Sequence, residues 1–216
     1  MKQLTVKKVQ APEGLTAAQV PALMDENKVA FHVIDTVNWK DYPYQPEVKF
    51  QIAHTGKEIL LHYQVTEHSV RAVAAEDDGR VWEDSCTEFF VSPEGNDFYY
   101  NFECNCIGKL LLHGGKPGNR PAASEQLMKS ISRWSSLGNQ PFEEKVGECS
   151  WESALVIPVS ALFGHQVSQL DGQEMRANFY KCGDLLQTPH FLSWNAIDLP
   201  EPKFHCPEFF GKIMFE

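Results

Sequence analysis

The sequence predicts an all-β fold, a single antiparallel β-sandwich with one or two short helices, on three observations. After residue 28, short segments of alternating polar and apolar residues follow one another, and they are rich in β-branched and aromatic residues. Turn signals such as HTGKE, SPEGND and CIGK separate these segments. Strands do not alternate regularly with helices, which argues against a doubly wound parallel sheet. Short strands at this spacing are typical of a sandwich.

The predicted strands cover most of the chain. In order, they are residues 29–35, 48–55, 59–67, 86–93, 97–106, 109–114, 150–158, 175–182, 191–197 and 211–216. We expect one short helix over 16–27, after an N-capping Thr16, and a second over 158–164, closed by Gly164. The longest irregular segment is 114–140, and we expect it to be functional or mobile because connections of this length usually are.

The overall charge narrows the class of partner. The 216 residues include 29 Asp and Glu against 19 Lys and Arg, whereas nucleic-acid binding needs a basic surface, so we expect no nucleic-acid partner. No apolar run resembles a secretory signal or a transmembrane span, so we expect no membrane partner, and a cytoplasmic location if the chain is complete. The chain contains no internal repeats, and we predict one domain over residues 1–216, with residues 1–28 packed on it as an N-terminal extension.

Neither a metal site nor a catalytic motif is evident. The six cysteines do not read as a disulfide scaffold in a chain this long. Cys104 and Cys106 precede His113, but no second ligand pair stands at the spacing of a zinc site. Serine-hydrolase, zinc-protease and P-loop motifs are missing, so we predict that the protein is not an enzyme. Glycoside hydrolysis by the acids at 83–88 is the alternative.

Trp82 and Glu83 form the first candidate ligand contact. Trp82 follows the polar turn EDDGR and is flanked by Glu83 and Asp84, which makes it difficult for the ring to enter a core. A flat exposed ring matches the C–H face of a sugar. The alternative is a rim residue that caps the sandwich core.

Glu88 interrupts an apolar strand. Alternation places Cys86, Glu88 and Phe90 on one face of the strand, and a charge in that position must be paired, solvated or used. If this face lines a cleft, the carboxylate accepts hydrogen bonds from sugar hydroxyls. The alternative is a salt bridge on a solvated face.

Two further strands carry polar side chains on one face. Asn101 and Glu103 alternate with core-like residues in YYNFECNC, and Arg176, Asn178 and Tyr180 share one face of RANFYKCGD. Fixed amides, carboxylates and guanidinium groups form a rigid array of donors and acceptors for hydroxyls. A plain solvated face remains the alternative.

The segment before the last strand holds the remaining candidates. EPKFHCPEFFGKIMFE contains two prolines and several aromatic residues. We expect Phe209 and Phe210 to seal the sandwich, which leaves Phe204 or His205 for a cleft. Trp194, between strand-like apolar residues, is expected in the core.

These motifs together resemble the family 9 carbohydrate-binding modules and their bacterial family 9-like relatives, within the DOMON-like β-sandwich group. The similarity covers most of the chain from about residue 30. VWEDSCTEFFVSPEG, WESALVIPVSALF, RANFYKCGD with FLSWNAI, and FHCPEFFGKIMFE carry it.

The resemblance implies a non-catalytic sandwich that clamps a terminal sugar between two aromatic rings. Trp82 stands where the family has its first ring, and Glu88 where it has an acid that bonds hydroxyls. Phe204 replaces the second ring, usually Trp, and Asn101 replaces a strand Arg. No cofactor is expected, although structural calcium, frequent in the family, has a candidate in the turn SPEGND. A haem-binding DOMON-like module is a further alternative, but no His and Met stand in a telling pair.

Overall fold

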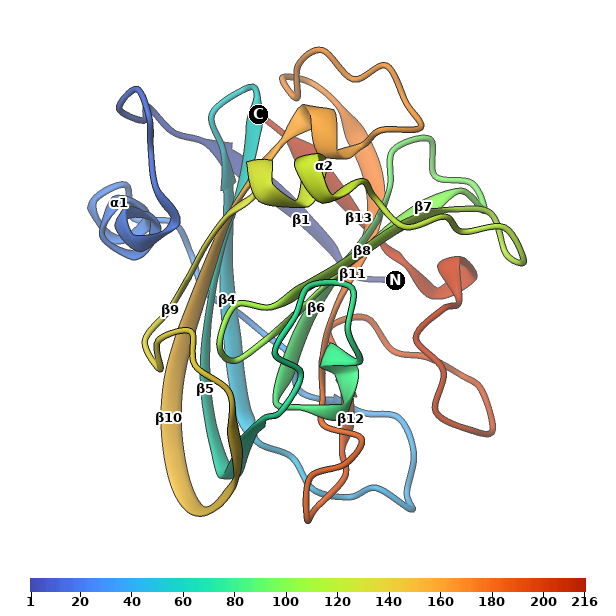
Figure 1. The fold of residues 1–216 in the computed structure, drawn as a ribbon. Helices are drawn as coiled ribbons and strands as arrows, with labels where there is room; N and C mark the ends of the chain where they lie inside the picture. The colour runs from blue at the N-terminus through green and yellow to red at the C-terminus, as the bar shows by residue number, and fades with distance from the viewer.

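The computed structural model describes residues 1–216, which form two layers of one strongly curled sheet. Figure 1 shows the two layers facing each other. The first layer contains β8 (Leu110–Gly115), β7 (Tyr99–Asn105), β6 (Cys86–Ser92), β11 (Glu174–Cys182) and β13 (Gly211–Phe215). The second contains β4 (Glu47–His54), β5 (Glu58–Ala72), β10 (Phe142–Pro158) and β9 (Ser132–Ser135). Three small strands lie at the margins: β2 (His32–Val33), β3 (Thr36–Val37) and β12 (Phe191–Ser193). The predicted all-β sandwich is therefore confirmed.

The strand β1 (Gln3–Lys8) joins the two layers. Residues 3–6 pair parallel with β13, and residues 7–8 pair parallel with β4. All other strand pairs are antiparallel. The first eight residues therefore contribute a strand to the sheet, where the sequence predicted only a packed extension.

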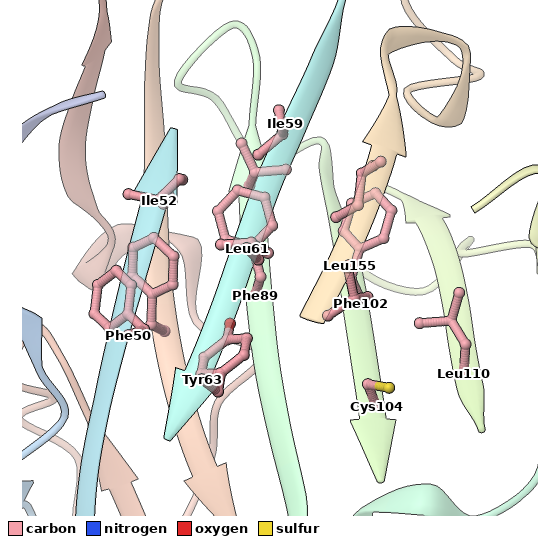
Figure 2. Close-up of a cluster of buried hydrophobic side chains, with 14 of the residues drawn as sticks. Phe50, Ile52, Ile59, Leu61, Tyr63, Phe89, Phe102, Cys104, Leu110 and Leu155 are labelled. Atoms are coloured by element: carbon pink, nitrogen blue, oxygen red, sulfur yellow. The ribbon is translucent and has the colours of Figure 1, made fainter. Parts of the chain in front are cut away.

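The main core lies between the layers. Figure 2 shows Phe50, Ile52, Leu61 and Tyr63 of the second layer facing Phe89 and its neighbours of the first. The Phe50 ring stacks on Phe179, with centroids 3.9 Å apart. Removing this apolar area from water is the main favourable contribution to folding.

Short helices cover the outer face of the second layer. The 3-10 helix η1 (Ala17–Gln19) and α1 (Val20–Glu26) bury Val20 and Met24 against Leu60, Ala154 and Val156. The predicted helix over 16–27 is present, although it is divided into these two pieces. No helix is both long and apolar enough to span a membrane.

The outer face of the first layer is covered only in part, by loops. Alternation turns Phe89 and Phe102 inward and turns Glu88, Asn101 and Glu103 outward. Residues of the C-terminal segment, among them Cys206 and Phe210, pack on this outer face beside η4 (Pro207–Phe209). A part of the face thus stays open, and the candidate site lies there.

The structure differs from the predicted elements in four of the segments. Residues 29–35 form only the two-residue strand β2, and β12 ends at Ser193. β10 begins at Phe142, eight residues before its predicted start, because its exposed first half has no buried face to produce alternation. The 114–140 segment contains α2 (Glu125–Ser130) and β9, and the Ser124 hydroxyl caps α2 by accepting from the Leu127 N–H at 3.2 Å.

Candidate functional site

A cleft of about 650 Å³ opens on the outer face of the first layer. Six of the predicted ligand contacts line it: Trp82, Glu88, Asn101, Glu103, Phe204 and His205. The lining also includes residues that the sequence analysis did not select, among them Tyr99, His113, Arg120, Asp184 and Lys203. Segments more than 120 residues apart in the chain therefore meet at one concave surface, as ligand sites usually require.

The floor of the cleft is built from three adjacent strands. Glu88 of β6 lies directly opposite Glu103 of β7, which lies opposite Leu111 of β8. Two residues further along the same pair of strands, Asn101 of β7 lies opposite His113 of β8. The strand ladder fixes the positions of these side chains, and the Asn101 amide donates to the Glu103 carboxylate at 2.8 Å.

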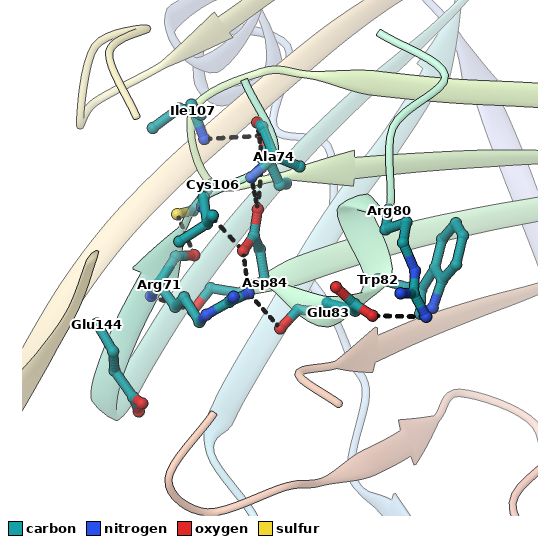
Figure 3. A network of polar contacts seen from close by, with 12 residues as sticks. Arg71, Ala74, Arg80, Trp82, Glu83, Asp84, Cys106, Ile107 and Glu144 are labelled. Carbon is teal, nitrogen blue, oxygen red and sulfur yellow. Dashed lines mark hydrogen bonds and ion pairs between the residues drawn. The ribbon is translucent and has the colours of Figure 1, made fainter. Parts of the chain in front are cut away.

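Trp82 is held at the rim by the turn η2 (Val81–Glu83). The carboxylate of Asp84, fully buried, accepts hydrogen bonds from the Val73 and Ala74 N–H groups, both at 2.9 Å, and from Arg71 at 2.6 Å. Figure 3 shows this network beside Trp82. Asp84 is thus a structural anchor that ties η2 to the end of β5.

Two aromatic rings of the cleft, those of Trp82 and Phe204, each lie against a neighbouring side chain. The Arg80 guanidinium lies 5.8 Å from the Trp82 ring, and Glu83 holds it with an ion pair of 2.7 Å. The Phe204 ring stacks on Tyr180 with centroids 4.2 Å apart and planes inclined by 9°. Both rings line the cleft, where an aromatic face can meet the C–H groups of a ligand.

Arg120 brings a cation into the cleft from the long loop. It donates to the Tyr99 and Gly115 carbonyls at 2.9 and 2.8 Å and to the Asn101 side chain, and its guanidinium lies 3.6 Å from the Tyr99 ring centre. The loop can turn back so tightly because Gly115 lacks a side chain: a Cβ there would lie 2.1 Å from the Asn119 carbonyl oxygen. The signal in the sequence was a GG pair followed by PGNR in a long connection.

Burial changes the protonation of the floor. Desolvation raises the pKa of Glu88 well above its usual value and that of Glu103 to about 7. It also raises the pKa of Asp184 to about 6, and it lowers the pKa of His205 to about 4, with Arg120 adding to that effect. Near neutral pH the floor therefore holds both protonated and ionised carboxyl groups, which can donate to hydroxyls as well as accept from them.

Known proteins share both the sequence pattern and the fold of this chain. The sequence profile of carbohydrate-binding family 9 matches residues 18–215. The chain belongs to carbohydrate-binding family 9. A solved structure of a candidate carbohydrate-binding protein from Bacteroides uniformis is 62% identical, covers 100% of this chain and 99% of its own, and superposes with a TM-score of 0.98. No curated protein matches the sequence.

Two more distant structures are family 9 modules from Caldicellulosiruptor kristjanssonii, in complex with glucose and with cellotriose. Each is 11% identical and covers 100% of this chain, with TM-scores of 0.65 and 0.61. The aligned regions cover 96% and 94% of the two family 9 chains. At that identity they show the shared fold. The predicted family and sandwich are thereby confirmed.

Four predicted contacts lie outside the lining of this family 9 cleft. Arg176 donates to the Glu208 carbonyl at 3.2 Å, and the Asn178 amide donates to the Asn195 carbonyl at 3.0 Å. Tyr180 is buried beneath Phe204, to whose carbonyl its hydroxyl donates at 3.2 Å. Glu83 pairs with Arg80. The face shared by Arg176, Asn178 and Tyr180 is the predicted one, but the C-terminal segment covers it, so these side chains support the site from beneath.

Two places in the structure bring together side chains of the types that bind metals. In the SPEGND turn, Glu94 accepts from Asn96 at 2.7 Å and Asp97 pairs with Lys116 at 3.4 Å, so neighbouring protein groups already use both acids. One group brings three buried ligand atoms together, those of Cys86, Glu88 and Cys182, and of these Glu88 and Cys182 line the cleft. Nothing in the sequence spacing indicates this group, because its members come from two strands.

Proposed function

We propose that this family 9 protein binds carbohydrate without cleaving it, with a terminal sugar held between Trp82 and Phe204. The observation that carries the proposal is the pair of aromatic rings: each lies against a neighbouring side chain, and both line one cleft with polar groups at its floor. Ring faces attract the weakly positive C–H groups of a pyranose, and this contact removes apolar area from water.

The polar groups at the floor would select the hydroxyls. Glu88, Glu103 and Asn101 stand on rigid strands, and Arg120 adds a guanidinium that bonds strongly to oxygen acceptors. In the family, by resemblance, a strand Arg supplies this charge, and here Asn101 occupies its place. We infer that Arg120 substitutes for it from the loop, since its guanidinium reaches the Asn101 side chain.

A glycosidase is the second candidate, and the geometry disfavours it. Such enzymes place two carboxyl groups on either side of the scissile bond. Glu88 and Glu103 are direct neighbours on adjacent strands and rise from the same floor. Incubation with an oligosaccharide panel should therefore release no shorter sugars, and any such product would favour the enzyme.

Calorimetry on the Trp82→Ala variant tests the binding proposal. Titration with glucose and cellotriose should show wild-type affinity in the micromolar range or weaker, since a polar ligand must lose its water on binding. Trp82→Ala should show no detectable binding of either sugar, and its circular dichroism spectrum should match that of the wild type. Phe31→Ala is the matched control, because Phe31 is an aromatic side chain, 39% exposed, that lies outside the cleft. Unchanged affinity in Trp82→Ala would contradict the stacking model.

A further inference from the structure

Two thiols and a carboxyl group meet beside the cleft, and one thiol and the carboxyl line it. Cys86 of β6 lies directly opposite Cys182 of β11, and Glu88 follows two residues after Cys86 on the same face of β6. The two sulfur atoms and a Glu88 oxygen all lie within 4.8 Å of one another. Cys86 is 0% exposed, Cys182 1% and Glu88 3%.

The carboxylate in this group has no cationic partner. Its side chain receives one hydrogen bond, from the Cys182 thiol at 3.0 Å, and it forms no ion pair with Lys, Arg or His. A buried carboxylate usually has a paired charge or bonds to a metal, because an uncompensated buried charge is expensive. The Cys182 thiol is a weak donor, so without a cation this buried carboxyl is neutral, as described above for the cleft floor, and a bound metal would hold it ionised.

The spacing suits a small thiophilic cation. Zn²⁺ binds thiolates at about 2.3 Å and carboxylate oxygens at about 2.0–2.2 Å in a tetrahedron, so two ligand atoms lie roughly 3.5–3.8 Å apart. The three ligand atoms lie within 4.8 Å of one another, which is close to that spacing. Thiolate ligands favour Zn²⁺ over Ca²⁺ or Mg²⁺, which take oxygen. Glu88 and Cys182 line the cleft, which provides an entry path and an open fourth position.

We propose that Cys86, Cys182 and Glu88 form a Zn²⁺ site whose fourth ligand position faces the cleft. Binding of the metal releases the protons of the two thiols and of the Glu88 carboxyl, and one Glu88 oxygen suffices as a ligand, which leaves the other to the cleft. The site does not depend on sugar binding, so its test contains no sugar.

Titration of the full-length protein with Co²⁺ tests the proposal. The protein is first treated with a chelator and a phosphine reductant, so that no metal or disulfide occupies the thiols, and the chelator is then removed. We expect one equivalent of Co²⁺ to give the intense near-ultraviolet absorption of thiolate-to-cobalt charge transfer, together with visible bands of tetrahedral cobalt. One equivalent of Zn²⁺ should abolish both. No charge-transfer band in the wild-type protein would overturn the proposal, whatever the variants show.

Variants assign the ligands. Cys86→Ser and Cys182→Ser should each weaken Co²⁺ affinity at least tenfold and reduce the charge-transfer band, and Glu88→Gln should weaken affinity while keeping the band. Cys149→Ser is the control, because Cys149 is a partly exposed free thiol outside the group, and it should change neither. Thermal unfolding without metal checks that each variant folds. Equal loss in Cys149→Ser, or full cobalt binding in both other serine variants, would overturn the assignment.

Discussion

Asp84 shows how a residue can be correctly noticed and wrongly interpreted. The sequence placed Trp82 near the surface because two acids flank it, but Asp84 is fully buried, and four donors surround its carboxylate: Arg71, Val73, Ala74 and Asn105. The ring lines the cleft because this anchored acid fixes the turn that carries it, and not because the acid is solvated. The burial of a carboxylate depends on donors from other segments, and no local pattern reports them.

Alternation was reliable for individual strand residues. It placed Glu88, Asn101 and Glu103 on one outward face, and the structure places all three on the cleft floor. It also grouped Arg176 and Asn178 correctly on one face, yet could not show that the C-terminal segment covers that face. Period-two reasoning identifies a face, whereas only the tertiary fold decides what lies on it.

Arg120 supports a prediction at this scale. Replacement by Met keeps most of the side-chain length and removes the guanidinium that reaches Asn101 and lies over Tyr99. We expect glucose affinity to fall at least tenfold, which corresponds to roughly 1.4 kcal/mol or more. Calorimetry measures the loss, and Lys116→Met, an exposed cation of the same loop, should retain binding. Retained affinity in Arg120→Met would show that the guanidinium does not contact the ligand.

At the scale of elements, strands were easier to predict than the loops that complete the site. Eight or more residues of alternating character sufficed for β4, β5 and β11, whereas β1 is short and β10 begins in an exposed half. The loops carrying Arg120 and Phe204 have no periodicity. Contacts with distant segments position them, such as the Tyr99 carbonyl for Arg120 and the Tyr180 ring for Phe204.

The turn η2 gives a prediction for an element. Asp84→Ala removes the acceptor of two backbone N–H groups and leaves Arg71, which is mostly buried, without its ion-pair partner. We expect the free energy of unfolding to fall by about 3–5 kcal/mol. We also expect sugar affinity to fall, because Trp82 loses its fixed position. Urea denaturation measures the first and calorimetry the second.

Glu83→Ala is the matched control for that experiment. Glu83 is the neighbouring acid and pairs with the exposed Arg80, so its removal should cost about 1 kcal/mol or less. If the two variants are equally stable, the buried carboxylate is not the anchor of η2.

At the scale of the whole molecule, charges inside the sandwich link its layers. Lys181 of β11 and Glu67 of β5 are both buried and pair at 2.8 Å, and the Trp151 indole donates to Glu67 at 2.7 Å. The net acidic composition cannot show that opposite charges from distant strands meet inside. Such a pair is fixed only when both layers are in place.

The pH dependence of stability combines opposing contributions from buried groups across the molecule. Burial lowers the pKa of His190 to about 2 and of His205 to about 4, so their contribution to stability is lost as pH falls below about 6.5, where the unfolded chain takes up protons. Burial raises the pKa of Glu103 to about 7 and of Asp184 to about 6. These carboxyls act in the opposite direction: the unfolded chain ionises first, so stability is lost as pH rises from about 4 to 7. The plot of wild-type stability against pH therefore separates neither the contribution of the histidines nor that of the carboxyls.

A difference between variants isolates Glu103. Because the pKa of Glu103 is raised in the folded protein, ionising this carboxyl lowers the free energy of unfolding. The loss is absent below about pH 4.5 and complete above pH 7, where it is on the order of 3 kcal/mol. Glu103→Gln keeps an acceptor for Asn101 and cannot ionise. Relative to wild type, the metal-free variant should gain stability at pH 8 and little at pH 4.5, measured by urea denaturation at both values. Glu148→Gln, at an exposed position on β10, is the control: its stability relative to wild type should be the same at pH 4.5 and at pH 8. An equal effect of Glu103→Gln at the two pH values would mean that the cleft floor keeps this carboxylate ionised, and the protein would then present a fixed negative charge, and no proton donor, at this position.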